Sequence, residues 1–475
     1  MRPESTRRAT ALSNLAAMRT GELGFWWRSL GGQPPAREPL HGTVEADVAI
    51  VGAGYTGLWT AYYLKRARPS LRIVVLEAQR AGFGASGRNG GWVSGFFAGP
   101  ARVYERPGGR RSYIALQREM FATVREIGDV LEREQIDAEF VAAGQLEVAL
   151  DAPQAERLRV HASELHALGF DERDLRIVAR DELDARVRVA GARLATFSPH
   201  VARVHPAKLL RGLAAAVERA GVTLYQRTRV RELRPGEART ELGAVRARWL
   251  VRATEGYTSS LRGQRRTLVP INSSMIVTEP LPPAAWEQIG WEGRELLGDA
   301  AHVFVYLQRT LDERIAIGGR GVPYRFASRT DGDGRTARAT VHELRRKLEA
   351  MFPPAAGAEV DHAWSGVLGV ARDWCVTVDA DPTSRLASAG GYVGEGVAAA
   401  NLAGRMLRDL LLDRPGELTA LPWVGRRPGS WEPEPLRWLG IRGVYSLYRL
   451  ADRSERRSGR SSRLAALVDA TSGRR

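Results

Sequence analysis

Gly52-Ala53-Gly54-Tyr55-Thr56-Gly57 is the stretch that decides the fold of this chain. It follows a short apolar run, residues 47–51, and precedes a segment with helical apolar spacing, residues 58–67. A second apolar run, residues 73–76, then ends at Glu77. The order predicts a strand, a tight glycine turn, a helix and a second strand, which together begin an α/β sheet.

The spacing of the three glycines indicates what such a turn binds. Gly52 allows the turn off the strand, Gly54 lets the backbone approach a pyrophosphate, and Gly57 lets the helix pack close to the sheet. The pyrophosphate then lies at the helix N-terminus, where free N–H groups and the helix dipole favour negative charge. Glu77 follows the last glycine of the turn by about twenty residues, the spacing of an acid that hydrogen-bonds ribose hydroxyls. An acid at this position also disfavours a 2′-phosphate. The stretch predicts a site for NAD or FAD rather than NADP; the alternative is a glycine turn in an unrelated α/β protein.

A dense glycine segment, residues 82–92, follows Glu77. It is too rich in glycine for a regular helix or strand. Arg88 can neutralise a pyrophosphate, and Ser86 and Asn89 can hydrogen-bond a phosphate or the edge of a ring. We interpret the segment as an ordered contact surface for the same ligand, with a flexible surface loop as the alternative.

A second glycine turn, residues 390–397, precedes a predicted helix near the other end of the chain. A helix N-terminus of this kind can hold a negative or electron-rich group. Two such turns in one chain favour a long, two-ended cofactor, with the pyrophosphate at one turn and the pyrimidine edge of a flavin at the other. They therefore favour FAD over NAD.

The composition argues against several other classes of protein. The chain has 475 residues and a formal charge of +16, but its arginines are scattered and no nucleic-acid-binding module is recognisable. We therefore expect no nucleic-acid partner. Cys375 is the single cysteine and the eight histidines are dispersed, so we expect neither disulfides nor a metal site. No apolar run reaches the roughly eighteen residues of a membrane-spanning helix.

The N-terminus is predicted to be a disordered tail over residues 1–20, and the protein to be cytoplasmic. Arg7-Arg8 and the weakly apolar stretch after them leave a twin-arginine export signal as the alternative. Polar residues interrupt that stretch, however, and Arg19 ends it early. Phe25-Trp26-Trp27 follow, and we expect them to pack on the body of the protein as a brace.

The remaining segments show helical or strand-like patterns. Helical spacing of apolar residues predicts helices over residues 111–135, 152–168, 181–187, 206–220, 339–352 and 398–412. Strand-like patterns predict strands over residues 140–150, 222–233, 249–253 and 364–378, and antiparallel strands within residues 268–330.

Together these segments resemble the D-amino-acid-oxidase-like superfamily of FAD-dependent oxidoreductases, and within it the gamma-glutamylputrescine oxidoreductase-like group. The stretches that carry the resemblance are DVAIVGAGYTGLWTAYYL (47–64), VVLEAQRAGFGASGRNGGW (74–92), VHPAKLLRGLAAAVERAGVTLY (204–225), VRATEGYT (251–258) and GGYVGEGVAAANLAGRMLRDLL (390–411). The resemblance implies an α/β fold. In it, a glutathione-reductase-type FAD-binding Rossmann domain is interleaved with an α+β substrate domain built on a large mixed or antiparallel sheet.

The implied domains are discontinuous along the chain. Residues 1–44 form the tail and brace, and residues 414–475 form a C-terminal helical extension. The FAD-binding domain comprises residues 45–105, 200–265 and 360–413. The substrate domain comprises residues 106–199 and 266–359.

The resemblance also implies which residues hold FAD, which we expect to be bound without a covalent bond. The glycines of the first turn and Glu77 would hold the ADP half, and Val230 would contact adenine through its backbone. The segment from Ser86 to Gly90 would lie along the pyrophosphate and flavin, and the second turn along the pyrimidine edge. The predicted set is Gly52, Ala53, Gly54, Tyr55, Thr56, Gly57, Glu77, Ala78, Ala85, Ser86, Arg88, Asn89, Gly90, Gly91, Val230, Thr254, Gly394, Glu395, Gly396 and Val397.

The implied reaction is the oxidation of a C–N bond in a small amine or amino acid. A hydride passes from the carbon beside the nitrogen to the flavin, the imine hydrolyses, and oxygen reoxidises the flavin to give hydrogen peroxide. One alternative is a dehydrogenase that passes the electrons to a carrier. Another is a flavoprotein attached to a membrane surface by an amphipathic C-terminal segment, residues 431–449, although docking of that segment on its own domain is the favoured expectation.

No catalytic residue is predicted, but three side chains are candidates for the substrate pocket: Tyr306, Trp92 and Arg372. Amino-acid oxidases of this superfamily often place an arginine two residues after the glycine of a motif like Trp364-Ser365-Gly366, where it binds the substrate carboxylate. This chain has Leu368 at that position. The departure favours an amine over an α-amino acid.

The second departure concerns attachment of the flavin. Sarcosine-oxidase-like relatives can bind flavin covalently through a cysteine, but Cys375 lies later in the chain than that cysteine would align. We therefore expect Cys375 to be a packing residue.

Overall fold

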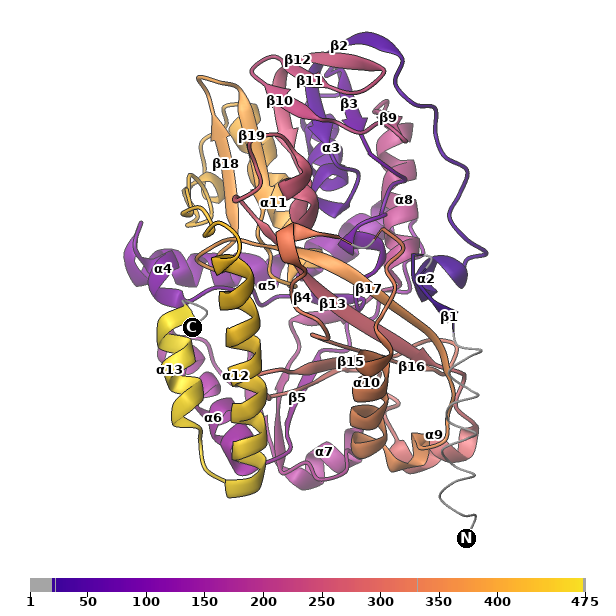
Figure 1. Cartoon of the computed structure of the whole chain (residues 1–475), viewed down its shortest axis with the longest axis vertical. Helices are drawn as coiled ribbons and strands as arrows, with labels where there is room; N and C mark the ends of the chain where they lie inside the picture. Colours follow the sequence, from indigo (N-terminus) through magenta and orange to yellow (C-terminus); the bar gives the residue numbers. More distant parts are fainter. Residues whose placement is uncertain (1–18, 22, 331, 473–475) are drawn as a thin grey trace.

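A computed structural model describes residues 19–21, 23–330 and 332–472. Two mixed sheets form the framework of the molecule (Figure 1). The smaller sheet consists, in spatial order, of β10 (Glu232–Arg234), β11 (Glu237–Arg239), β12 (Gly243–Arg252), β2 (Gly42–Val51), β3 (Ile73–Leu76) and β9 (Thr223–Tyr225), with β19 (Leu386–Gly390) and then β18 (Thr377–Asp381) joined to β12. The larger sheet consists of β1 (Arg19–Thr20), β17 (Val360–Val370), β13 (Val269–Thr278), β16 (Ile315–Gly319), β15 (Val305–Arg309), β14 (Leu296–Asp299), β5 (Gln145–Ala149), β7 (Leu194–Ser198) and β6 (Arg176–Val178). The predicted α/β class is confirmed.

Helices cover both sheets, and a short pair of strands, β4 (Trp92–Ser94) and β8 (Val201–Arg203), lies beside them. The helices are α2 (Phe25–Arg28), α3 (Tyr55–Ala67), α4 (Ala101–Glu105), α5 (Gly109–Arg133), α6 (Ala152–Ala167), α7 (Arg180–Arg186), α8 (Pro206–Arg219), α9 (Pro283–Ile289), α10 (Arg338–Met351), α11 (Gly396–Leu411), α12 (Leu436–Ser458) and α13 (Arg463–Ser472).

The first glycine turn connects β2 to α3 as the sequence predicts. Gly52 has a φ of +109°, and a Cβ there would lie 2.4 Å from the carbonyl oxygen of Ala253, so only glycine fits. A Cβ on Gly57 would lie 1.9 Å from the carbonyl oxygen of Gly52 and 3.2 Å from the side chain of Ile50. The absence of a side chain at Gly57 therefore allows the helix to approach the backbone of the turn very closely. Its approach to the sheet at Ile50 is less tight.

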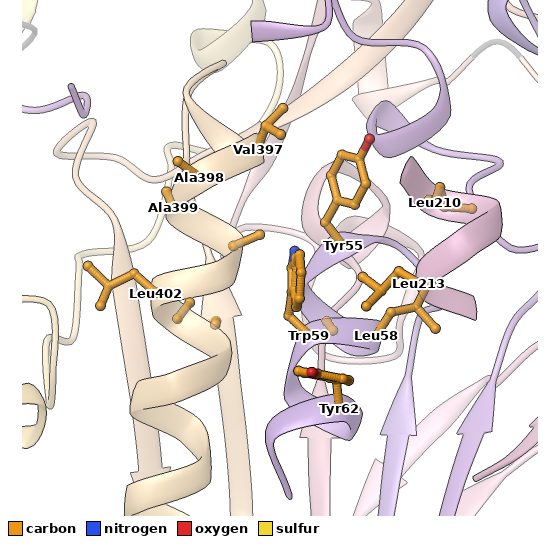
Figure 2. Packing of buried hydrophobic residues seen from close by; sticks show 14 of the residues in the cluster. Tyr55, Leu58, Trp59, Tyr62, Leu210, Leu213, Val397, Ala398, Ala399 and Leu402 are labelled. Carbon is orange, nitrogen blue, oxygen red and sulfur yellow. The ribbon is translucent and has the colours of Figure 1, made fainter. Parts of the chain in front are cut away.

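Helix α3 is buried between α8 and α11 (Figure 2). Tyr55, Trp59 and Tyr62 project from α3 into an apolar core to which both neighbouring helices contribute. Burial of one such side chain stabilises a fold by roughly 1.5–3 kcal/mol. This packing fixes the start of α3, and with it the glycine turn, relative to the second turn at the start of α11.

Side chains alternate across the nine-stranded sheet. Leu297, Val305 and Ile317 belong to an apolar core that α9 and α10 complete on one face. On the other face, Tyr306 is the cross-strand partner of Gly298, Gly298 of Glu147, and Glu147 of Thr196. The second face thus presents a row of polar side chains interrupted by glycine.

Several segments differ from the prediction. Arg19–Thr20 was expected to be disordered, but its backbone pairs in parallel with His362–Ala363 at the edge of the larger sheet. Residues 1–18, which contain the rest of the predicted tail and the alternative export signal, lie outside the described residues. The strand predicted over residues 222–233 is two strands, because Arg227 takes a φ of +50° between them. The strand predicted over residues 364–378 is likewise divided, at Trp374, where φ is +61°.

The C-terminal extension docks on the body through one face of α12. Ile441, Tyr445 and Tyr448 pack in an apolar cluster with residues from β13 and β17, which bears out the expectation that this helix packs on its own domain. Asp452 accepts the N–H groups of His302 and Val303, at 2.8 Å and 3.0 Å.

One buried ion pair adds to this docking. Glu455 pairs with Arg157 at 2.8 Å. The ligand atoms of His302, Asp452 and Glu455 lie within 4.8 Å of one another, a spacing that could suit a metal ion, but the hydrogen bonds just given already occupy both carboxylates. Within the described part of the chain, no helix is long and apolar enough to cross a membrane.

Candidate active site

Two cavities meet between the sheets. The first, of about 300 Å³, follows the first glycine turn, and we call it the turn cavity. The second, of about 410 Å³, lies against the polar face of the larger sheet, and we call it the sheet cavity. Both cavities are lined by Ala85, Asn89, Leu368, Gly394 and Val397. These five residues form the junction, at which the two cavities are continuous.

Most of the predicted cofactor residues line one or both cavities. The turn cavity is lined by Gly52, Gly54, Tyr55, Thr56, Glu77, Ala78, Ala85, Ser86, Asn89, Val230, Thr254, Gly394, Gly396 and Val397. The sheet cavity adds Arg88, Gly90 and Glu395, together with the predicted pocket residues Trp92 and Tyr306. The structure thus brings both glycine turns and the segment from Ser86 to Gly90 to one place.

Three predicted residues lie behind the cavity wall rather than in it: Ala53, Gly57 and Gly91. The N–H of Ala53 donates to the carboxylate of Glu77 at 2.9 Å, and the N–H of Gly91 donates to the side-chain oxygen of Asn89 at 2.8 Å. These residues shape the wall through their backbones. Their predicted contact with a ligand stays a prediction.

Glu77 lies at the wall of the turn cavity. Its carboxylate accepts hydrogen bonds from the N–H groups of Ala53 and Gln79, each at 2.9 Å. Burial raises the pKa of Glu77, while the two N–H groups lower it. Glu77 therefore also fixes the glycine turn, in addition to its predicted role toward ribose.

Ser86 ties the dense glycine segment to the start of α3. Its hydroxyl oxygen accepts the N–H of Tyr55 at 2.9 Å. A Cβ on Gly54 would lie 2.8 Å from the same oxygen. Ser86 and Gly54 therefore form one surface at the helix N-terminus, where a phosphate is favoured.

Two predicted arginines lie elsewhere than expected. The guanidinium of Arg88 is buried and donates to the carbonyl oxygens of Ser365 and Gly332, at 3.1 Å and 3.2 Å. Backbone carbonyls thus take up two of the five donors of this guanidinium. Arg372 lines neither cavity, because its guanidinium pairs with Glu432 at 2.8 Å. The structure therefore places Arg372 outside both cavities, and its role in substrate binding stays a prediction.

Comparison with known proteins identifies the family. The family model described as FAD dependent oxidoreductase (DAO) matches residues 47–410. The chain belongs to this family. It is 29% identical over 418 residues to a probable oxidoreductase OrdL of Rhizobium meliloti, covering 83% of this chain and 90% of that protein. It is 29% identical over 391 residues to the gamma-glutamylputrescine oxidoreductase of Escherichia coli, covering 79% of this chain and 85% of that protein.

A solved structure agrees with the fold. Glycine oxidase from Geobacillus kaustophilus matches with a TM-score of 0.67 and 23% identity, covering 82% of this chain and 100% of that one. The resemblance seen in the sequence is confirmed, and this protein is an FAD-dependent oxidoreductase.

The residues around the turn cavity fit FAD in this oxidoreductase. The turn offers a wall without side chains at Gly52 and Gly54, the start of α3 offers a positive helix end, and Glu77 offers a carboxylate toward ribose. The junction then opens on the second turn at Gly394. A cofactor with adenosine at one end, a pyrophosphate in the middle and a flat ring at the other end matches this order.

One cavity residue that sequence reasoning missed is Glu255. It follows Thr254 with a φ of +42°, and its carboxylate accepts the N–H of Tyr392 at 3.0 Å. Burial raises the pKa of Glu255 to about 7, against the lowering effect of backbone N–H groups and the charge of Arg252. The signal was an acid directly after a predicted strand, in the stretch VRATEGYT.

Arg320 is a second missed residue, and it lies in the sheet cavity just after β16. Arg320 is 9% exposed, and its guanidinium donates to the carbonyl oxygen of Val393 at 2.9 Å. Its Nε has no acceptor among the described residues. No sequence signal singled it out, because only the sheet places β16 beside the second glycine turn.

Glu395 and Tyr306 complete the charged and polar groups near the junction. Burial raises the pKa of the Glu395 carboxyl, while a hydrogen bond from Ser94 and the charge of Arg320 lower it. The Tyr306 hydroxyl lies 2.9 Å from the hydroxyl of Ser273. Near the junction, the sheet cavity thus offers the Glu395 carboxylate, the Arg320 guanidinium and two hydroxyls to a small polar molecule.

Proposed function

We propose that this oxidoreductase oxidises a C–N bond of a small amine or amino acid, with oxygen as electron acceptor and hydrogen peroxide as product. The observation that carries the proposal is the junction, where a polar cavity opens onto the place between the two glycine turns. Bound FAD would supply a hydride acceptor for the carbon beside the substrate nitrogen. The names of two relatives, gamma-glutamylputrescine oxidoreductase and glycine oxidase, support this class of substrate.

Glu395 is the residue we propose to take up the substrate's proton. An amine that arrives protonated must lose a proton before its carbon can give up a hydride. The Glu395 carboxylate lines the sheet cavity beside Gly394, and burial raises its pKa, so that it binds a proton more readily than an exposed carboxylate.

Arg320 bears on the choice between an amine and an amino acid. Leu368 occupies the position of the usual arginine, which favoured an amine. A Cβ on Gly394, however, would lie 3.4 Å from Arg320 Nη2 and 3.6 Å from a methyl group of Leu368. A guanidinium therefore lies beside Leu368, although it comes from another strand. This supports a substrate that carries a carboxylate as well as an amine.

The experiment that tests the function is anaerobic mixing with candidate substrates. The purified protein, with its visible spectrum recorded, is mixed with glycine, sarcosine, putrescine and gamma-glutamylputrescine. We expect at least one amine or amino acid to bleach the flavin spectrum. A flavin spectrum that no amine or amino acid changes would contradict the proposal.

The electron acceptor is tested separately. With a substrate that bleaches the flavin, peroxide formation in air is compared with reduction of an artificial dye under argon. Peroxide formed at the rate of substrate turnover supports an oxidase. Slow peroxide formation with fast dye reduction would establish the alternative, a dehydrogenase that uses a carrier.

We further propose that FAD is held without a covalent bond. Cys375 is buried, lines neither cavity, and has a pKa raised by burial to about 12. A thiol of this kind is a poor nucleophile. Acid precipitation should release all of the flavin into the supernatant, and flavin retained on the protein would contradict the assignment.

The domain division that we propose moves one boundary of the predicted one. β17 (Val360–Val370) pairs with β13 in the larger sheet, so residues 360–370 join the substrate domain. The FAD-binding domain then comprises residues 45–105, 200–265 and 371–413. A cytoplasmic location stays a prediction.

A second candidate function is attachment to an anionic membrane surface. The face of α12 opposite the docked face carries Leu436, Leu439, Leu447 and Leu450, which are 61%, 55%, 36% and 51% exposed. At helical spacing these leucines fall within an arc of roughly 80°. Exposed arginines, including Arg442 and Arg453, flank the stripe, while Asp452 and Glu455 are engaged by the body of the protein. A cationic helix with an apolar stripe fits an anionic lipid surface.

Vesicle sedimentation tests this candidate with the whole protein. We expect binding to vesicles that contain anionic lipid, weaker binding to zwitterionic vesicles, and loss of binding in the double variant Leu439→Gln, Leu450→Gln. Failure of the unaltered protein to sediment with anionic vesicles at low salt would exclude it.

A further inference from the structure

Three consecutive carbonyl groups of the dense glycine segment are each held by a side-chain donor from a different part of the chain. The indole N–H of Trp364 donates to the carbonyl oxygen of Arg88 at 2.9 Å. The indole N–H of Trp26 donates to the carbonyl oxygen of Asn89 at 2.7 Å. The amide of Gln308 donates to the carbonyl oxygen of Gly90. The three donors come from β17, α2 and β15, respectively.

These bonds set the direction of the N–H groups as well. In a planar trans peptide, the N–H points opposite to the C=O of the same peptide unit. The N–H groups of Asn89, Gly90 and Gly91 therefore point away from Trp364, Trp26 and Gln308, respectively. The N–H of Gly91 donates to the Asn89 side chain, at 2.8 Å.

The other two N–H groups have no such partner. Among the described residues, no hydrogen-bond acceptor takes the N–H of Asn89 or Gly90. Asn89 lines both cavities at the junction, and Gly90 lines the sheet cavity. Two peptide donors are thus held rigidly at the place where the cavity for FAD meets the cavity for substrate.

We propose that Trp26, Trp364 and Gln308 are positioning residues that aim the N–H groups of Asn89 and Gly90 at the flavin. A flavin ring gains electron density when it is reduced, and fixed N–H dipoles stabilise charge that develops next to them. The three side chains therefore strengthen FAD binding and raise the reduction potential of the bound flavin. The inference rests on FAD as cofactor and not on the proposed substrate.

The brace at the N-terminus is part of this arrangement. Trp26 lies edge-on to Trp364, with ring centroids 6.0 Å apart, and edge-on to His205, at 5.1 Å. It is 1% exposed. Trp26 thus supports the dense glycine segment from the side opposite the flavin, so the brace predicted from the sequence has a role in the site.

Gln308 is supported in turn by a buried arginine. Its side-chain oxygen accepts from Nη1 of Arg203 at 3.3 Å, and Arg203 is fully buried. Because the amide oxygen is fixed in this way, the amide nitrogen must face the Gly90 carbonyl. The orientation of this side chain therefore follows from its neighbours.

The test uses two variants that remove one donor each and keep the packing. Trp26→Phe keeps an aromatic ring against Trp364 and His205 but lacks the N–H. Gln308→Glu keeps an acceptor for Arg203 but has no donor for the Gly90 carbonyl. For each variant, FAD affinity is measured on apoprotein by quenching of flavin fluorescence, and the reduction potential is measured by equilibration with a reference dye. Neither readout needs a substrate.

We expect both variants to bind FAD several-fold more weakly and to show a more negative reduction potential. Trp27→Phe is the matched control, because Trp27 is on the same helix, is 3% exposed, and has an indole nitrogen without an acceptor in the described part of the chain. It should leave the potential unchanged. Wild-type affinity and potential in both donor variants would overturn the proposal, as would an equal shift in Trp27→Phe. If one donor variant fails to fold by circular dichroism, the other decides.

Discussion

The hydroxyl groups of Thr56 and Tyr392 lie 2.9 Å apart, and their hydrogen bond joins the two glycine turns of the chain. Thr56 lies in the first turn of α3, and Tyr392 lies just before α11. Both residues line the turn cavity, although 336 positions separate them in the sequence. The bond shows that the two turns, which the sequence suggested were two ends of one cofactor site, face each other directly.

Tyr392→Phe should therefore weaken FAD binding. The change removes a buried hydrogen bond worth about 1 kcal/mol and leaves the Thr56 hydroxyl without this partner. If the bond forms only when both turns are in place, this loss corresponds to a several-fold higher dissociation constant for FAD. Fluorescence titration of apoprotein with FAD measures the effect. Tyr445→Phe is a suitable control, since the buried Tyr445 hydroxyl has no partner among the described residues. Equal affinity in Tyr392→Phe and wild type would contradict the expectation.

Gly57→Ala should abolish the FAD site. A Cβ at this position would lie 1.9 Å from the carbonyl oxygen of Gly52, so the helix and the turn would have to separate by more than an ångström. We expect no flavin in the purified variant and a lower melting temperature. Gly440→Ala, on the exposed side of α12 with no atom within 4 Å, should instead be neutral or stabilising by up to about 1 kcal/mol. A yellow Gly57→Ala protein with full flavin occupancy would show that the contact relaxes without cost.

Arg320→Met should raise KM for substrates that carry a carboxylate. Loss of a charge-assisted hydrogen bond costs about 1.5–3 kcal/mol, or roughly ten- to a hundredfold in affinity. Steady-state kinetics with an amine that lacks the carboxylate should change much less. Arg372→Met serves as the control, because Arg372 pairs with Glu432 outside both cavities. An equal loss for both kinds of substrate would argue against a carboxylate at Arg320.

Glu255 should make stability fall as the pH rises. Its pKa is 4.5 without perturbation and about 7 in the folded protein. Between these values the folded protein holds a proton that the unfolded chain has lost, so the contribution of Glu255 is fully present below pH 4.5 and is lost as the pH rises through about 7. The loss amounts to at most about 3 kcal/mol.

The measurement compares wild type with Glu255→Gln, which mimics the protonated side chain. Melting temperatures of both holoenzymes are recorded from pH 5 to pH 8 with saturating FAD. Wild type should lose stability relative to the variant as the pH rises along this range, while all other titrating groups cancel in the comparison. A constant difference between the two proteins would show that Glu255 keeps one charge state throughout.

The core of the nucleotide site was predictable because its determinants are local. Gly52, Gly54 and Gly57 lie within six positions, and Glu77 follows one helix and one strand later. The backbone path through this strand–helix–strand unit therefore fixes the relative positions of the four residues. The same holds for the second turn at Gly394 and Gly396. The long helices were predictable for the same reason, since their apolar spacing is a property of neighbouring residues.

Arg88, Arg372 and Arg320 were not predictable, because a long side chain takes its partner from whichever strand or helix the fold brings near. Arg88 donates a hydrogen bond to the carbonyl of Ser365, and Arg372 forms an ion pair with Glu432. Arg320 reached the second glycine turn only because β16 lies two strands from β17 in the larger sheet.

The sequence by itself therefore determined the cofactor class, the two glycine turns and the family, since these depend on short-range backbone geometry. Only the tertiary structure decided how the site is completed. The Thr56–Tyr392 bond, the buried carboxylates of Glu255 and Glu395, and the donor from Trp26 to the Asn89 carbonyl all join segments that are far apart in the chain. Such contacts form when two sheets pack against shared helices. The sequence pattern of one segment does not specify which distant segment it will contact.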